Sequence, residues 1–348
     1  MAERVPDAGE VIHTHAAKHP DLQIANAHVK AHICLPDPTV GFYRGTRFDW
    51  SGVIFSLQCE GHEYYGPWFT RRDPSVFDFV FRGAEIIAGT HSAITGPSEE
   101  FVLPQGYDDA KAGATFVKIG VGVLRKPDES AYSCYNDYEI LDSGSWAIES
   151  TPTSVSFVQR LDNRSGYGYK YRKSLSLGST KPELEIEHSL ENTGRIALRT
   201  PHYNHNFLTL DRKPIGENLR IIFPFPVWSD AALNPAFVNV DGQQAAYRRM
   251  LVDDDVVAFP LFGFGGTAAD YDVRIHDRLS GAGVRMVGDR PLTRLAVWSI
   301  RSVLSVEPFI EVHVEPAATI RWATKYLYGS AAGALLAANS LQRDNASQ

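Results

Sequence analysis

The chain has 348 residues and a formal net charge of −7 at pH 7, with 44% hydrophobic and 22% charged residues. This composition is ordinary for a soluble globular protein. The acidic balance offers no basic surface for a phosphate backbone, which argues against nucleic acid as a partner. The N-terminus lacks the apolar stretch of a secretory signal, and the longest apolar run near the C-terminus, AAGALLAA, is too short to cross a bilayer. Neither export nor a membrane partner is therefore expected.

The three cysteines, Cys34, Cys59 and Cys134, are scattered along the chain. An odd number without CxxC spacing predicts free thiols rather than a disulfide framework or a structural zinc site. Free thiols suit a reducing compartment, so the expected location is the cytoplasm.

Short runs of β-branched and aromatic residues recur between Gly, Pro, Asn and Asp, which is typical of many short strands in a sandwich or barrel. In chain order, we predict strands over residues 53–60, 115–124, 145–150, 153–161, 169–177, 184–190, 219–225, 292–300, 309–316 and 319–328. Helical patterning is scarce, and only the terminal segments 8–18 and 331–343 are candidate helices. A chain of this length suits ~15 or more strands of ~6 residues in two stacked sheets.

The chain shows no composition shift that would mark a linker, and it shows no internal repeat. We therefore predict a single domain over residues 20–330. An N-terminal extension (1–19) precedes this domain, and a C-terminal tail (331–348) follows it. The sequence does not indicate an oligomeric state.

The segment TPHYNHNF carries His202 and His205 at HxxH spacing. This spacing can hold a metal on a helix, but Pro201 and the surrounding strand pattern argue against a helix. In an extended chain, residues three apart point to opposite faces, so no metal site is predicted. Tyr203, His205 and Phe207 then share one face, where the imidazole can lie over a sugar ring and donate a proton. A histidine that is merely hydrogen-bonded to the backbone is the alternative.

The segment SVEPFIEVHVEP (305–316) alternates between a mostly polar face, which includes Glu307, and a mostly apolar face. The apolar face is predicted to be core, and the polar face is either outer surface or the lining of a groove. Pro308 removes one hydrogen-bond donor from the sheet and keeps the preceding residue extended. Glu307 is therefore a candidate general base.

The segment GFYRGTRFDWSG (41–52) combines two arginines with several aromatic residues. Arginine forks bind hydroxyl and carboxylate groups, and aromatic faces stack on sugar rings. Arg44 and Arg47 are therefore candidates for substrate binding. A salt bridge to Asp49 beneath Trp50 is the alternative interpretation.

Together, these segments resemble the galactose mutarotase-like (aldose 1-epimerase) superfamily. HSLENTG followed by TPHYNHNFLTL is similar to the family's strand, Asn-Thr-Gly turn and histidine-bearing strand. LAVWSIRSVLSVEPFIEVHVEPAATIRWATKYLY is similar to the closing segment, with a Trp-bearing strand and a strand that carries the catalytic glutamate. Ala317 stands where the family's last turn usually has Gly. YRGTRFDWSGVI is similar to the first strands, where an arginine reaches the sugar.

The resemblance implies an all-β fold, a β-supersandwich of two large antiparallel sheets with an open groove. It implies a cofactor-free isomerase, a sugar mutarotase (aldose 1-epimerase), in which Glu307 takes the proton of the anomeric hydroxyl and His205 protonates the ring oxygen. The implied partner is a small-molecule sugar or sugar phosphate. The residues expected around that sugar are Arg47, Arg44, His91, Glu100, His202, Asn204 and Trp298.

The chain departs from the family where a His-Gly-Gly segment usually supplies a second histidine. Residues 89–101 stand in that place and offer His91, Glu99 and Glu100 instead. Arg44 and Arg47 can hold a phosphate, a carboxylate or neutral hydroxyls, so the identity of the sugar stays open. Two other functions stay open as well, because fold does not settle function. One is a carbohydrate-binding protein without catalysis. The other is a polysaccharide lyase or hydrolase, and a lyase would pair a Tyr or His base with an arginine or a cation.

Overall fold

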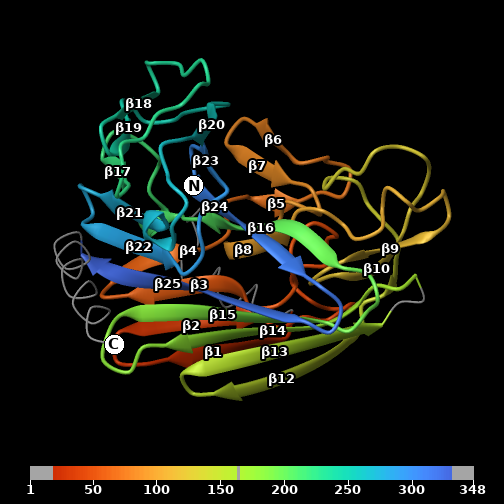
Figure 1. Ribbon diagram of the computed structural model, residues 1–348. Coiled ribbons are helices and arrows are strands. Elements are labelled where there is room, and N and C mark those ends of the chain that lie inside the picture. The colour runs from red at the N-terminus through yellow and green to blue at the C-terminus, as the bar shows by residue number, and fades with distance from the viewer. Residues whose placement is uncertain (1–18, 163–164, 331–348) are drawn as a thin grey trace, which may run out of the picture.

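The computed structural model describes residues 19–162 and 165–330 (Figure 1). Within these ranges the regular elements are strands and two short 3-10 helices, η1 (Leu210–Arg212) and η2 (Ala268–Asp270). The predicted all-β class is confirmed. The candidate helices at 8–18 and 331–343 lie outside the described residues. No helix in the described part of the chain has the length and apolar character needed to span a membrane.

The largest sheet contains ten antiparallel strands. Across the sheet they are β12 (Ser145–Thr151), β13 (Ser154–Asp162), β14 (Gly168–Leu177), β15 (Glu183–Asn192), β25 (Thr319–Ser330), β22 (Ala282–Gly288), β21 (Asp272–Asp277), β17 (Leu219–Ile222), β19 (Gln244–Tyr247) and β18 (Val238–Asp241). In β15 the even-numbered residues are buried and the odd-numbered ones are at least partly exposed, as the sequence predicts.

A second sheet carries the two segments that the sequence singles out. Its five antiparallel strands are, in order, β20 (Val256–Leu261), β23 (Arg294–Ile300), β24 (Val303–Val314), β16 (Leu198–Phe207) and β8 (Gly96–Phe101). A tight turn joins β23 to β24, because Ile300 pairs with Val303. Strand β16 lies between β24 and β8, so the histidine segment is held on both edges.

Three smaller sheets complete the fold. They are β1 (Asp21–Ala25), β2 (Val29–Cys34), β3 (Val53–Cys59) and β4 (His62–Tyr65); β11 (Ile140–Asp142), β10 (Gly122–Arg125) and β9 (Thr115–Lys118); and β5 (Arg71–Arg72), β7 (Glu85–Ala88) and β6 (Phe79–Arg82). The single strand predicted over 115–124 is wrong, because the chain turns back there between β9 and β10. Gly120 and Gly122 have φ angles of 80° and 151°, which favour a turn of glycines over a continuous strand.

The largest core cluster fills the space between the ten-stranded sheet and the other layer. It contains Ile186 and Tyr326 from the ten-stranded sheet, Val306 from the five-stranded sheet and Ile54 from the four-stranded sheet, all of them fully buried. Each such side chain contributes about 1.5–3 kcal/mol by leaving water. Figure 1 shows β16 and β24 above β14, β15 and β25. The predicted stacking of two layers is confirmed, although the second layer is divided among several sheets.

Strand β16 also carries a buried polar network on its inner face. Asn204 Nδ2 donates a hydrogen bond to the hydroxyl of Tyr326 (2.8 Å), and that hydroxyl donates to Asn206 Oδ1 (3.0 Å). Asn206 Nδ2 donates in turn to the carbonyl of Val306 on β24 (2.8 Å). Each of these bonds contributes about 1 kcal/mol, and losing one partner would leave a buried polar group unsatisfied. The network therefore fixes β16 against β24 immediately beside Glu307.

The turn between β24 and β25 contains a residue with strained backbone. Ala318 N donates to the carbonyl of Glu315 (3.0 Å), Pro316 occupies the second position, and Ala317 in the third has a φ of 61°. This is the pattern of a type II turn, which favours glycine at that third position. Ala317 is therefore held in the left-handed region, which a residue with a Cβ rarely adopts.

We expect Ala317→Gly to raise the free energy of unfolding by about 0.5–1 kcal/mol. The left-handed backbone costs a residue with a Cβ ~1–2 kcal/mol, and the greater freedom of glycine in the unfolded chain offsets part of the gain. Urea unfolding of the variant and the wild type measures the difference. Ala318→Gly is the matched control and should lower stability, because Ala318 has no positive φ to relieve. A loss of stability in Ala317→Gly would contradict this account of the turn.

Candidate functional site

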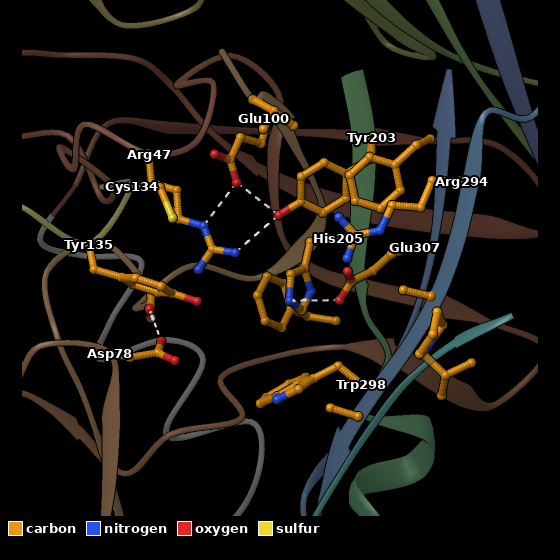
Figure 2. A pocket seen from close by; sticks show the side chains of 18 of the residues that line it. Arg47, Asp78, Glu100, Cys134, Tyr135, Tyr203, His205, Arg294, Trp298 and Glu307 are labelled. Atoms are coloured by element: carbon orange, nitrogen blue, oxygen red, sulfur yellow. Dashed lines mark hydrogen bonds and ion pairs between the residues drawn. The ribbon is translucent and has the colours of Figure 1, made fainter. Parts of the chain in front are cut away.

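A cavity of ≈ 480 Å³ lies over the outer face of the five-stranded sheet (Figure 2). Its walls come from the sheet and from segments that are distant in sequence. The sheet contributes Tyr203, His205, Phe207, Trp298, Glu307 and Phe309 among others, and the distant segments contribute Arg47, Trp68, Asp78, Cys134 and Tyr135. The site is therefore assembled by tertiary structure and not by one motif.

The strand register explains why these side chains meet, because paired residues of antiparallel strands project from the same face. The first row across β8, β16, β24 and β23 contains Glu100, Tyr203, Phe309 and Arg294. The next row, two residues along each strand, contains Ser98, His205, Glu307 and Ala296. His205 and Glu307 are consequently neighbours in the middle of the cavity floor.

The pair itself is close and almost closed to solvent. His205 Nε2 lies 3.2 Å from Glu307 Oε1, and the two side chains are 8% and 12% exposed. The imidazole stacks on Phe207 with ring centroids 3.9 Å apart, and its edge meets Trp298 at 5.4 Å. The other ring nitrogen, Nδ1, is buried and has no hydrogen-bond partner among the described residues. Aromatic packing, and not a further hydrogen bond, therefore holds the ring.

Burial governs the charge of this pair. It raises the pKa of Glu307 from 4.5 to about 7, although Arg47 and Arg294 partly oppose the shift. Burial, with the added effect of Arg47, lowers the pKa of His205 well below its ordinary 6.5. Both shifts disfavour the charged forms. Between these two limits the pair holds one proton, and both shifts place it on Glu307, with His205 neutral.

Beside the pair, Arg47 belongs to a buried charged group. Its Nε donates to Glu100 Oε2 (3.0 Å) and its Nη2 donates to the hydroxyl of Tyr203 (3.0 Å), which itself donates to Glu100 Oε2 (2.8 Å). Lys118 Nζ donates to Glu100 Oε1 (3.3 Å). Two cations face one carboxylate, so the group carries one positive charge next to Glu307. Figure 2 shows Arg47, Glu100 and Tyr203 joined by these bonds.

Of the predicted sugar contacts, Arg47, Glu100 and Trp298 line the cavity, whereas Arg44 and His91 do not. The side chain of Arg44 is exposed and donates to the carbonyl of Thr39 (2.6 Å). His91 is buried behind the wall, where its Nδ1 accepts a hydrogen bond from the backbone N–H of Thr46 (3.1 Å). Both lie in irregular segments, for which no strand period predicts the direction of a side chain. The structure therefore does not bring these two residues to the cavity.

His202 and Asn204 are also absent from the cavity lining. They lie on the inner face of β16, as the alternation of a strand requires. The His202 ring packs against Phe101 at 4.7 Å and Trp322 at 5.1 Å. The structure therefore places both residues in the packing between the sheets, and the predicted separation of His202 from His205 is confirmed.

Among the described residues, Glu99, His188 and His202 have potential metal-ligating atoms within 4.8 Å of one another. Glu99 Oε2, however, lies 2.8 Å from Lys173 Nζ and 2.8 Å from His188 Nε2. The lysine ammonium already compensates the buried carboxylate where a cation would bind. The cluster is therefore a buried ion pair flanked by two histidines.

Sequence reasoning missed much of the cavity lining, including Arg294 and Tyr135. It placed Tyr203 on the same face as His205 but did not give Tyr203 a role. Arg294 is placed by the β23–β24 register, which a two-residue loop at residues 301–302 would have revealed. Tyr135 comes from a loop and reaches the cavity 4.9 Å from Arg47, and no local pattern signals that contact.

No model of a known protein family matches the sequence, and no curated protein matches it significantly. Solved structures do match. A putative aldose 1-epimerase from Escherichia coli K12 has a TM-score of 0.52 and 13% identity, over 89% of this chain and 99% of that one. A galactose mutarotase related enzyme from Lactobacillus acidophilus has a TM-score of 0.50 and 13% identity, over 89% and 98%. A galactose mutarotase-like protein from Clostridium acetobutylicum has a TM-score of 0.51 and 12% identity, over 90% and 96%.

The layered antiparallel sheets, with a cavity over one of them, define an all-β sandwich protein. Its fold is the galactose mutarotase-like β-sandwich, shared over about nine-tenths of the chain. The resemblance that the sequence suggests is thereby confirmed for the fold. At these low identities the likeness extends no further than the fold.

The raised pKa of Glu307 predicts a pH-dependent loss of stability. The folded protein keeps this proton to about pH 7 and the unfolded chain only to about 4.5, so stability is full below pH 4.5 and falls as pH rises toward 7. The difference corresponds to about 3 kcal/mol. Glu307→Gln cannot ionise, so we expect it to gain about 3 kcal/mol relative to wild type between pH 4 and pH 8 in urea unfolding.

The matched control for this measurement is Glu311→Gln, since Glu311 is exposed on the same strand. Its stability relative to wild type should stay constant over the same pH range. If Glu307→Gln and wild type lost stability in parallel, the carboxyl of Glu307 would not be perturbed by burial.

Proposed function

We propose that the protein binds a sugar in its ring form and interconverts the two anomers, as a cofactor-free mutarotase. The observation that carries the proposal is the contact of 3.2 Å between His205 Nε2 and Glu307 Oε1 on the floor of the cavity. An acid and a base lie side by side there, against aromatic rings that suit the apolar faces of a sugar. The names of the structural neighbours point in the same direction.

In the proposed reaction, the proton of the pair first passes from Glu307 to His205 Nε2 across their contact. The ionised Glu307 then removes the proton from the anomeric hydroxyl while His205 delivers its proton to the ring oxygen. The bond between the anomeric carbon and the ring oxygen breaks, and the anomeric carbon becomes a carbonyl. Rotation about the adjacent carbon–carbon bond presents the other face of the carbonyl, and the reverse proton transfers close the ring. During ring opening Glu307 gains a proton and His205 loses one, and ring closure reverses both transfers. The pair therefore holds one proton before and after each step.

Binding of the sugar is assigned to the groups around the pair. The charged group of Arg47, Glu100 and Tyr203 offers donors and acceptors to hydroxyls, and Trp298 offers an aromatic face. Arg294 lies over the ring of Phe309 at 4.7 Å and projects at the rim of the cavity. Two arginines also suit a sugar that carries a phosphate. A cytoplasmic location belongs to this proposal, and the free thiols Cys34, Cys59 and Cys134 are compatible with it.

A polysaccharide lyase has less support from the same residues. That reaction needs a basic tyrosine or histidine beside a cation that neutralises a uronate. Burial raises the pKa of Tyr203 well above its usual value, and its hydroxyl donates to Glu100, so it is a poor base. A protein that only binds sugars would not need the buried carboxyl of Glu307 beside an imidazole.

The direct test follows anomer exchange of freshly dissolved glucose, galactose and their 6-phosphates by polarimetry and exchange NMR. Wild type should accelerate exchange of at least one of these sugars. Glu307→Gln and His205→Ala should each lower kcat/KM by ~10²–10⁴-fold, since each removes one proton-transfer group. Glu311→Gln and His313→Ala, which alter exposed residues of β24, are controls and should keep full activity. Absence of acceleration by wild type would contradict the proposal, and an active Glu307→Gln would exclude Glu307 as base.

The shared proton also predicts the pH profile. Above about pH 7 Glu307 is ionised and His205 is neutral, so the pair has no proton to give to the ring oxygen. We therefore expect kcat/KM to fall as pH rises through about 7, after subtraction of spontaneous exchange. On the acid side, activity should persist to well below pH 6.5, where His205 takes up a second proton. A kcat/KM that kept rising to pH 9 would show that the active pair is fully deprotonated.

A further inference from the structure

The wall of the cavity that faces the pair of His205 and Glu307 carries polar side chains that the proposed reaction does not use. Asp78, Ser92 and Tyr135 line the cavity there and form what we call the polar wall. They come from segments outside the five-stranded sheet: Asp78 directly precedes β6, Ser92 follows β7, and Tyr135 lies in the loop between β10 and β11. Figure 2 shows Asp78 and Tyr135 on one side of the cavity, with His205 and Glu307 on the other. A ligand that fills the cavity from the pair therefore meets the polar wall at its far end.

The protein binds only one oxygen of the Asp78 carboxyl. Ser92 Oγ donates a hydrogen bond to Asp78 Oδ1, and the N–H of Gly89 donates to the backbone carbonyl of Asp78 (2.7 Å). Among the described residues, no group donates to Oδ2. The side chain is partly buried, and a carboxylate in that setting is stabilised by donors to both oxygens. The position of Asp78 is therefore fixed, while one acceptor is left for a ligand.

Arg47 and Tyr135 bring unused hydrogen-bonding groups to the same part of the cavity. Arg47 donates through Nε and Nη2 to the cavity floor, whereas its Nη1 makes no hydrogen bond within the described residues. The guanidinium lies 4.9 Å from the centroid of the Tyr135 ring, and the hydroxyl of Tyr135 also makes no hydrogen bond within that part of the chain. Burial raises the pKa of Asp78, and the charge of Arg47 partly opposes this shift, as it does at Glu307. Arg47 therefore acts on the carboxyls on both sides of the cavity.

A sugar hydroxyl matches these groups better than a phosphate does. A hydroxyl can donate to Asp78 Oδ2 and accept from Arg47 Nη1 at the same time, because it is both a donor and an acceptor. An ionised phosphate offers only acceptors, and the charge of a carboxylate repels it. The hydroxyls that can reach the polar wall are those at C3 and C4, because these carbons lie across the pyranose ring from the ring oxygen and from C1.

We propose that Asp78 is a specificity-determining residue, whose Oδ2 accepts a hydrogen bond from the C3 or C4 hydroxyl of a neutral sugar. Arg47 Nη1 and the hydroxyl of Tyr135 complete this subsite. The inference rests on the proposed function, which places C1 and the ring oxygen at Glu307 and His205. It also selects between the sugars that two arginines can hold. The phosphate of a hexose 6-phosphate extends from C5, next to C4, so the charge of Asp78 disfavours it.

The substitution Asp78→Asn separates this role from a structural one. Asparagine has the size of aspartate, and its amide oxygen can still accept from Ser92, so the tie to the segment after β7 is kept. The amide NH2 then takes the place of Oδ2 and turns a charged acceptor into a neutral donor. Glu85→Gln is the matched control, since it makes the same kind of change on the β6–β7 hairpin, at a side chain that is 46% exposed and does not line the cavity. The thermal midpoints of both variants should stay near that of wild type.

The test measures binding to the full-length protein by titration calorimetry at pH 7, with glucose, galactose, their 3-deoxy and 4-deoxy analogues and their 6-phosphates. In wild type we expect glucose or galactose to bind about ten- to a hundredfold more tightly than its 3-deoxy or 4-deoxy analogue. In Asp78→Asn the parent sugar should bind more weakly by that factor, and the ratio should fall to near one. The preference for the neutral sugar over its 6-phosphate should shrink as well, while Glu85→Gln should behave as wild type. In anomer exchange, Asp78→Asn should change KM more than kcat.

Four results would overturn the role of Asp78: no binding of any of these sugars, equal affinity of wild type for the parent sugars and their deoxy analogues, discrimination that survives in Asp78→Asn, or an equal loss in Glu85→Gln. Binding and anomer exchange are separate readouts, so the two proposals fail separately. Discrimination that depends on Asp78 without accelerated exchange would support the subsite and reject the mutarotase. Accelerated exchange with an affinity that does not depend on Asp78 would do the reverse.

Discussion

The site depends on strand β16, because both faces of this strand carry side chains that the structure needs. Because successive side chains point to opposite faces, the strand that presents Tyr203 and His205 to the cavity must present Asn204 and Asn206 to the interior. Those inner amides are hydrogen-bonded to Tyr326 and to the backbone of β24. The cavity floor is therefore held in place by polar groups that face away from the cavity. A shift of one residue in register would exchange the two sets and destroy both.

The sequence predicted what depends on local periodicity. Most strands, the shared face of Tyr203, His205 and Phe207, and the opposite placement of His202 follow from alternation alone, and the structure confirms them. The pairing of Glu307 with His205 came from a family resemblance, since the two residues are far apart in sequence. The positions of Arg44 and His91 away from the cavity could not be predicted, because irregular loops carry no period. Arg294 was missed because the register of a hairpin had to be known first. The domain boundaries at 20 and 330 stay predictions.

The site contains polar groups that a stable core normally excludes. A carboxyl and an imidazole are buried among Phe207, Trp298 and other aromatic rings, where both lose hydration. Burial of these two groups lowers the stability of the folded protein, and the large apolar cluster on the other face of the sheet offsets this loss. Solved structures with the same arrangement of sheets are only 12% and 13% identical to this chain, so many different sequences can form the fold.

The unpartnered Nδ1 of His205 has a consequence for the position of the imidazole proton. In many catalytic sites a third group binds the far nitrogen and locks one tautomer of the imidazole. Within the described residues nothing does so here, and the ring is held only by stacking. Only Glu307, 3.2 Å from Nε2, then sets the tautomer: a protonated Glu307 donates to Nε2 and leaves the ring proton on Nδ1, whereas an ionised Glu307 accepts a proton from Nε2. A change in the charge of this one carboxyl is therefore enough to move the imidazole proton from one nitrogen to the other.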